Sequence, residues 1–259
     1  MNTMLKTLVV ASLVASGAVH AEEAAPSDHT VTGYIGLLSS YNLRGITNAP
    51  ESDTPAVQGS IDYSHSSGFY AGYWFSTLSY SYTSLNLLDE PDDSKKSLES
   101  DFYAGYKGKI GDIGYQVGGT VYYYYPGWES TGYETMLGLT YGSFGLTAQT
   151  LLNDVTFGNA GDTYVVASYS QPLPMGFTGA AKLGAYYYDN SDPVLGTGAK
   201  AKQAIVTTEE FGFRHLILGV TKPLAATGAT MGLDYIIGGY DRVDVKQDNK
   251  LVASLSMTF

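Results

Sequence analysis

From about residue 30 onward the chain repeats one pattern, in which apolar and polar residues alternate over segments of roughly ten positions. In the last segment Leu255, Met257 and Phe259 are apolar, whereas Ser256 and Thr258 between them are polar. A period of two places successive side chains on opposite faces of a strand. The pattern therefore predicts β-strands with one apolar face and one polar face.

The alternation predicts about twelve strands, and the connections between them are long and short in turn. An even strand number with this asymmetry is typical of bacterial outer-membrane barrels, which have long extracellular loops and short periplasmic turns. Most segments are long enough to cross a bilayer as tilted strands. The expected strands are residues 30–41, 56–64, 69–80, 99–108, 113–125, 132–141, 144–152, 163–170, 177–188, 211–220, 229–237 and 251–259.

We therefore predict an all-β fold, a transmembrane antiparallel up-and-down β-barrel. Hydrocarbon cannot hydrogen-bond to backbone groups, so a sheet in it must close, and the last strand must pair with the first. A soluble barrel or sandwich is the alternative, because it would alternate too. Tyrosine runs near strand ends, at residues 122–125 and 186–188, predict an aromatic girdle at the membrane interface.

The amino end predicts export. Lys6 lies in a basic first region, residues 7–19 are apolar, and Ala21 completes a cleavage site of small residues. The apolar run is shorter than the roughly 20 residues of a membrane-spanning helix, which disfavours an anchor. We expect a cleaved signal peptide at residues 1–21, a periplasmic tail at 22–29 and a barrel at 30–259, located in the outer membrane of a Gram-negative bacterium.

Composition narrows the classes of partner. The chain has 259 residues, no cysteine, a net charge of −11 and only 15% charged residues, against about 25% in a soluble domain. Lack of cysteine removes disulfides and thiolate metal sites, and the acidic balance disfavours nucleic acid. We expect no cofactor. The expected partners are outer-membrane lipid and lipopolysaccharide, the barrel-assembly machinery and small hydrophilic solutes, with the oligomeric state left open.

Polar residues on the face opposite the apolar one are the candidate pore lining. A polar interior fits a water-filled channel, and the alternative is a packed network of paired charges that plugs the barrel. Twelve strands give a backbone diameter near ~24 Å and an opening of roughly 5–10 Å. Because carboxylates outnumber bases, we expect weak cation selectivity. The candidates are Gln58, Asp62, Glu99, Asp101, Gln116, Glu134, Gln149, Lys182 and Asp234.

Arg44 lies where the first strand meets its loop, and two roles are open for it: a guanidinium that orients solutes at the mouth, or a structural salt bridge. A barrel enzyme would need Ser, His and Asp or Asn to converge. His29 falls in the predicted tail and His65 in a predicted turn, and His215 has no motif around it. We therefore expect no enzyme.

Three further motifs are weak. The acidic run at residues 88–93 could hold Ca²⁺ but lacks the spacing of a calcium loop. The glycine-rich run at 196–202 lacks the strand–helix context of a phosphate site. The tyrosines at 122–125 could stack a sugar, although an interfacial girdle is the favoured interpretation.

The stretch LRGITNAPESDTPAVQGSIDYSHSSGFYAGYWFS, residues 43–76, resembles the hallmark of the proteobacterial family of TorF-type porins. The resemblance extends over about the whole mature chain. Leu43 and Thr47 depart from the family pattern, and the loop at 189–209 is longer than is typical. The matching positions are Arg44, Gly45, Ile46, Pro55, Ala56, Val57, Gln58, Gly59, Asp62, Tyr63, Ser67, Gly68, Phe69, Tyr70, Ala71 and Gly72.

The resemblance implies an outer-membrane pore without naming a cargo. The last residues are similar to the carboxy-terminal signal that the barrel-assembly machinery reads, with Leu255, Met257 and Phe259 as the signal residues. Two functions follow: a porin-like channel for passive diffusion of small hydrophilic solutes or ions, or a plugged barrel that acts as a structural, adhesive or surface-binding protein.

Overall fold

The computed structural model describes residues 27–82, 96–127, 130–191, 206–225 and 227–259. The predicted signal peptide at residues 1–21, most of the predicted tail, the acidic run at 88–93 and the glycine-rich run at 196–202 lie outside the described residues. The described residues contain no helix that is both long and apolar enough to cross a membrane.

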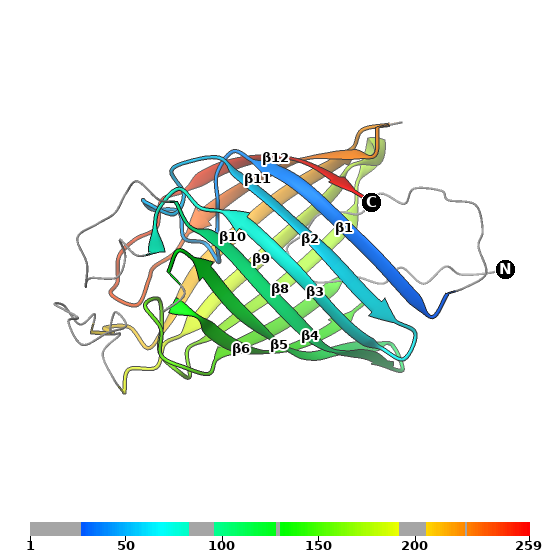
Figure 1. Cartoon of the computed structure of the whole chain (residues 1–259). Helices are drawn as coiled ribbons and strands as arrows, with labels where there is room; N and C mark the ends of the chain where they lie inside the picture. The colour runs from blue at the N-terminus through cyan, green and yellow to red at the C-terminus, as the bar shows by residue number, and fades with distance from the viewer. Residues whose placement is uncertain (1–26, 83–95, 128–129, 192–205, 226) are drawn as a thin grey trace.

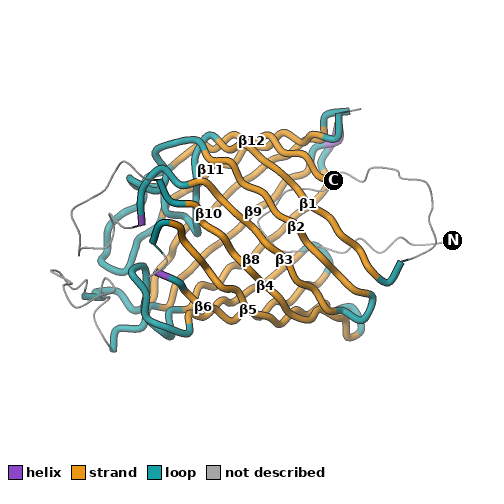
Figure 2. Tube along the Cα trace, viewed as in Figure 1, coloured by secondary structure: helices purple, strands orange, loops and turns teal. Residues whose placement is uncertain are grey.

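Twelve antiparallel strands, as counted over the described residues, wind around one axis and form a closed barrel (Figures 1 and 2). A short 3₁₀ turn, Pro174–Gly176, lies between two of them. The strands are β1 His29–Leu38, β2 Ala56–His65, β3 Phe69–Thr77, β4 Leu98–Ile110, β5 Ile113–Tyr125, β6 Gly132–Tyr141, β7 Phe144–Leu151, β8 Thr163–Pro172, β9 Thr178–Tyr187, β10 Phe211–Pro223, β11 Ala229–Gly238 and β12 Lys250–Thr258.

The first and last strands seal the sheet. Leu37 of β1 lies opposite Leu255 of β12. Gly33 and Phe259 exchange two backbone hydrogen bonds, of 2.8 and 2.9 Å. Each strand pairs only with its neighbours in the chain, apart from this closure. Closure leaves no row of unpaired backbone groups at an edge, and the prediction of an all-β up-and-down barrel is confirmed.

The two ends of the barrel differ as the sequence predicts. The connections at residues 66–68, 111–112, 142–143, 173–177 and 224–228 are short and share one end, at the right in Figure 1. The strands β1, β3, β9 and β11 end at the opposite end of the barrel, and the connections that follow them are longer in sequence. We call these the short-turn end and the long-loop end.

The outside of the barrel is apolar. Exposed side chains of this face include Val31, which is 67% exposed, and Leu137, which is 58% exposed. Their neighbours along each strand turn inward and are more buried, as a pleated strand requires. An apolar belt of this kind fits hydrocarbon and not water. Other members are Ile35, Leu37, Ile61, Phe102, Val117, Leu139, Leu146, Leu183, Leu218, Met231, Leu233, Leu251 and Leu255.

Only β5 and β6 have the predicted bounds; the other strands differ by one to three residues at one or both ends, and β1 ends at Leu38, whereas the pattern predicts a strand to residue 41. β3 ends at Thr77, and Tyr80 beyond it is 8% exposed, so these residues leave the wall and pack inside. β1 begins at His29, which the sequence analysis placed in the tail. β2 ends at His65, which it placed in a turn, and the two histidines are partners across the strand pair.

A β-bulge interrupts β10 between Phe213 and His215. Phe213 points outward and Arg214 is buried, as alternation requires, but the next residue, His215, is buried too. The extra residue reverses the inside–outside order of the rest of the strand. Ile217 accordingly lines an internal cavity, while Leu218 is 46% exposed.

A charge on the outer wall tests the lipid-facing assignment. We expect Leu137→Arg to lower the free energy of unfolding from lipid vesicles by about 2–4 kcal/mol, because the guanidinium would be placed in hydrocarbon. Leu137→Phe is the matched control and should change it by less than about 1.5 kcal/mol. Equal effects of the two substitutions in denaturant titrations would contradict an outward, lipid-solvated Leu137.

Candidate solute path through the barrel

The loop at residues 39–55, which joins β1 to β2, folds into the barrel. Its tip takes left-handed backbone angles, with φ of 48° at Arg44 and 76° at Gly45. A Cβ on Gly45 would lie 2.6 Å from the Cβ of His215 on β10. Only glycine therefore allows the tip to lie this close to the opposite part of the wall.

Arg44 fastens this tip to the far wall. Its two terminal nitrogens donate to the two carboxylate oxygens of Glu134 on β6, at 2.7 and 2.6 Å. They also donate to the hydroxyls of Tyr186 on β9 and Tyr122 on β5, each at 2.8 Å. The loop joins the neighbouring strands β1 and β2, but Arg44 at its tip reaches β6, so the loop crosses the lumen. Of the two roles left open for Arg44, the structure shows the ion pair.

The other side of the loop is bonded to the connection between β11 and β12. The Thr47 hydroxyl donates to the Asp248 carbonyl at 2.6 Å, and the Asn48 amide donates to the Lys246 carbonyl at 3.0 Å. Lys250 donates to the Ser52 hydroxyl at 2.8 Å. Because the loop is held on both sides, it is a fixed part of the interior.

Two of the candidate carboxylates are buried in a network with tyrosines. Glu99 is fully buried and accepts hydrogen bonds from the hydroxyls of Tyr41 and Tyr124. Glu134 accepts a further bond from Tyr122 at 2.6 Å, and Gln149 donates to Glu134 at 3.3 Å. These contacts pack the lumen along β4 to β7. Glu99 and Gln149 belong to this filled part of the interior, and Glu134 also borders the larger cavity described below.

The tyrosine runs do not form the predicted girdle as a whole. Tyr122 and Tyr124 are only 7% and 2% exposed and face inward, whereas Tyr125 is 67% exposed. Tyr186 and Tyr188 stack inside, with ring centroids 4.8 Å apart. Alternation divides each run between the two faces. The girdle prediction is wrong for the inward tyrosines, which serve as hydrogen-bond donors and aromatic walls.

Three other candidates also lie on the inner face. Asp62 accepts hydrogen bonds from Ser60, at 2.5 Å, and from Tyr103. One carboxylate oxygen of Asp101 is buried and has no partner among the described residues. Gln116 lies on β5, opposite Lys107 of β4. All three are inward, but none lines either of the two cavities described next.

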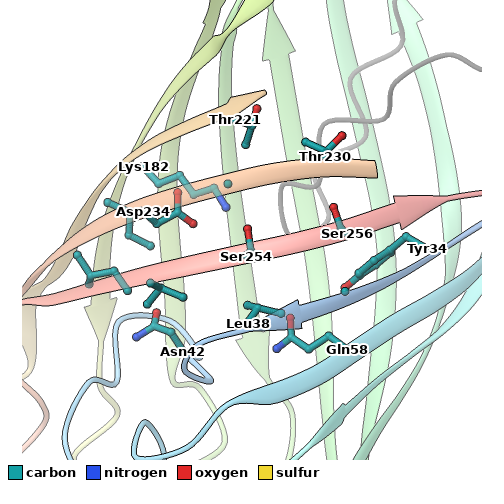
Figure 3. A pocket seen from close by; sticks show the side chains of 15 residues that line it. Tyr34, Leu38, Asn42, Gln58, Lys182, Thr221, Thr230, Asp234, Ser254 and Ser256 are labelled. Carbon is teal, nitrogen blue, oxygen red and sulfur yellow. The ribbon is translucent and has the colours of Figure 1, made fainter. Parts of the chain in front are cut away.

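The remaining three candidates line a cavity of about 140 Å³ between β1, β2 and β9 to β12. Lys182 on β9 and Asp234 on β11 extend toward each other, and Gln58 lies across the cavity from them (Figure 3). Asn42 of the inward loop closes one side (Figure 3). The cavity has one positive and one negative side chain, so its charges balance.

A larger cavity of about 560 Å³ lies toward the long-loop end. Leu43 and Arg44 of the inward loop line it. Its lining also includes an ion pair between Arg242 and Asp162, residues that lie far apart in the sequence. We call it the vestibule. The full set of charged side chains in its lining is Arg44, Arg214, Arg242, Glu51, Glu134, Asp162 and Asp241.

Sequence reasoning missed Arg214 and Glu51. Arg214 is 4% exposed and, among the described residues, donates to two backbone carbonyls, those of Arg44 at 3.0 Å and Tyr240 at 3.2 Å. The adjacent pair Arg214 and His215 breaks the alternation of β10, and this break is the signal that could have revealed the bulge. Glu51 lies in a loop, where alternation gives no information about direction.

His215, the histidine considered for an enzyme, has a tyrosine as its partner. Its Nε2 lies 2.6 Å from the Tyr164 hydroxyl, and its Nδ1 is buried without a partner among the described residues. Within the described part of the chain, no group of three or more His, Asp or Glu side chains could hold a metal ion. The absence of enzyme activity stays a prediction.

The residues of the expected assembly signal lie on the outer wall. Leu255, Met257 and Phe259 are 43%, 49% and 74% exposed. Their common outward direction follows from the alternation of β12. Recognition by the assembly machinery stays a prediction.

The fold matches several solved structures. "KdgM porin" superposes with a TM-score of 0.52 at 6% identity, over 89% of this chain and 99% of that chain. Pseudomonas aeruginosa OprD has a TM-score of 0.42 at 12% identity, over 88% and 66% of the two chains. Outer membrane phospholipase A from Escherichia coli has a TM-score of 0.42 at 11% identity, over 87% and 95%. At 6% identity the likeness to "KdgM porin" shows the fold alone.

No curated protein matches the chain significantly in sequence. Residues 21–254 match the family Gcw_chp, which is described as "Bacterial protein of unknown function". That description names no pore, so the likeness to TorF-type porins stays a prediction. Because the match covers most of its length, the chain belongs to the bacterial Gcw_chp family.

Proposed function

We propose that the protein is an outer-membrane channel through which small hydrophilic solutes or ions diffuse passively, and that residues 1–21 are the signal peptide that exports it. The apolar outer wall supports a location in lipid, because water would not solvate it. The similarity of fold to a protein named as a porin supports a channel. The polar inner face supports a path for hydrophilic solutes.

One observation carries this proposal: neighbouring residues of the same loop line two different cavities. Asn42 lines the cavity of about 140 Å³, whereas the next two residues, Leu43 and Arg44, line the vestibule of about 560 Å³. The loop at residues 39–55 therefore divides the lumen. In a channel this loop is the constriction, and the Arg44–Glu134 ion pair fixes its position.

The charges along the two cavities support only weak ion selectivity. Lys182 and Asp234 balance in the smaller cavity. The vestibule lining holds one more carboxylate than it holds guanidinium groups. Glu99, which suggested an acidic ring, is buried under tyrosine hydroxyls and does not face solvent. We propose a slight preference for cations.

A plugged barrel is the second candidate. The observation that favours it is the packing of the lumen along β4 to β7, where Tyr41 and Tyr124 enclose Glu99. Narrow barrels are often filled in this way. In that case the long loops would have a structural, adhesive or surface-binding role.

Single-channel recording separates the two candidates. We expect the purified mature protein to give stepwise currents in a planar bilayer in KCl, because water-sized space lies on both sides of the loop. Heat-modifiable mobility on gels controls for folding. A folded barrel that stays electrically silent would contradict the channel and support the plug.

Removal of the Arg44 side chain tests the constriction. We expect Arg44→Ala to raise single-channel conductance about twofold, because it removes the guanidinium and releases the loop from Glu134, and pore conductance follows the narrowest section. Lys222→Ala, an exposed side chain on the outer face of β10 near the short-turn end, is the control and should leave conductance unchanged. Wild-type conductance in the Arg44 variant would place the constriction elsewhere.

Reversal potentials in a KCl gradient test the selectivity. We expect a small potential of the sign that indicates cation preference, since the lining charges nearly cancel. Screening should weaken the preference further at high salt. A potential that indicates anion preference would refute the proposed selectivity and leave the channel itself intact.

A further inference from the structure

The vestibule has the size and lining of a ligand site. Its volume of about 560 Å³ lies within the ~300–1,000 Å³ that small-molecule pockets occupy. Its walls come from the inward loop, from the strands β5, β6, β9 and β10, and from the segments that follow β3, β7, β9 and β11. The inner walls include buried side chains such as Tyr124 and Arg214, which the fold holds in place without a ligand.

Two of the three vestibule arginines are already neutralised by contact. Arg44 is paired with Glu134 at 2.6 Å, and Arg242 is paired with Asp162. Arg214 differs. It is buried, its two hydrogen bonds go to backbone carbonyls, and no carboxylate of the described residues is within ion-pair distance of it. Since a guanidinium has five N–H donors, Arg214 retains the capacity to bind an anionic group.

Glu51 supplies the opposite charge on the same cavity. It lines the vestibule, and among the described residues it has no ion-pair partner. Burial raises the pKa of the Glu51 carboxyl, and the nearby Arg214 guanidinium lowers it in part. Arg214 and Glu51 are thus a cationic and an anionic side chain of the vestibule that are not paired with each other. Asp241, the other lining carboxylate without an ion pair among the described residues, instead accepts backbone hydrogen bonds from Val243 and Val245.

The rest of the lining is aromatic or apolar. Tyr186 and Tyr188 stack with nearly parallel rings, and Phe157 packs edge-on against Tyr82. Leu43 and Ile46 add aliphatic surface from the inward loop. Walls of this type bind an apolar body and leave few polar groups to fix its orientation. The aromatic residues of the lining are Tyr80, Tyr82, Tyr122, Tyr124, Phe157, Tyr186 and Tyr188.

We propose that the vestibule binds a small zwitterion, an α-amino acid with an apolar or aromatic side chain, through its carboxylate on Arg214 and its ammonium group on Glu51. The proposal rests on the proposed channel function, whose solute class it names. An uncharged solute would leave both charged side chains unpaired, and a simple anion or cation would leave one of them unpaired. A zwitterion satisfies both at once.

Calorimetric titration of the purified mature protein in detergent tests this proposal, with L-phenylalanine as the probe. We expect L-phenylalanine to bind, and both N-acetyl-L-phenylalanine and L-phenylalaninamide to bind at least about tenfold more weakly, because each lacks one charge. These comparisons use the unmodified protein, so they do not depend on whether a variant folds.

Substitutions of Arg214 and Glu51 test which side chain binds which charge of the amino acid. We expect Arg214→Gln and Glu51→Gln each to weaken L-phenylalanine binding by about tenfold or more. Arg214→Gln should have little further effect on the amide, and Glu51→Gln little further effect on the N-acetyl compound. Asp53→Asn, an exposed carboxylate of the same loop, is the matched control and should bind L-phenylalanine like the wild type.

Absence of L-phenylalanine binding, or equal binding of all three compounds, would overturn the zwitterion site. Equal weakening by Asp53→Asn and Glu51→Gln would overturn the role of Glu51. The proposed channel fails by a different result, electrical silence of the folded barrel. A conducting barrel that does not bind L-phenylalanine removes only the site, and a silent barrel that binds it removes only the channel.

Discussion

The hydrogen bonds between β1 and β12 are the constraint on which the rest of the structure depends. A sheet placed in hydrocarbon cannot leave backbone groups unpaired, so it must close. Closure divides every strand into an outward and an inward row of side chains. Lipid solvates the outward row, which is apolar at residues such as Leu137 and Leu183. The inward row is confined to a narrow lumen and must find partners there, in water or in other side chains.

Inside the barrel some inward side chains are paired with other side chains, and others border open space. Along β4 to β7 the inward carboxylate of Glu99 is enclosed by the hydroxyls of Tyr41 and Tyr124. On the other side the lumen keeps open space beside Lys182 and Asp234 (Figure 3). The inward loop is the boundary between the smaller cavity and the vestibule. A buried ion pair is costly unless both partners are well hydrogen-bonded, and Arg44 and Glu134 meet this condition with two further tyrosines.

Periodicity predicts the wall of this barrel well and its interior poorly. Alternation gave the bounds of β5 and β6 and placed Gln58, Lys182 and Asp234 on the face that lines a cavity. It could not show that the loop at 39–55 enters the lumen, because loop direction depends on distant contacts such as Arg44 with Glu134. Nor could it place Arg214 beside an inward His215, since a single bulge in β10 reverses the order of the faces. The girdle prediction failed for a different reason: it treated each tyrosine run as one unit, although consecutive residues of a strand belong to opposite faces.

A double-mutant cycle on the Arg44–Glu134 pair tests the central claim, that the loop at residues 39–55 lies across the lumen and is held by the far wall. The free energy of unfolding would be measured in lipid vesicles for wild type, Arg44→Ala, Glu134→Ala and the double variant. Residues in direct contact show coupling energies of ~0.5–3 kcal/mol. For this bidentate ion pair the structure predicts a coupling energy near the upper end of that range. Additive effects, within about 0.5 kcal/mol, would mean that the two side chains do not meet and that the loop lies outside the lumen.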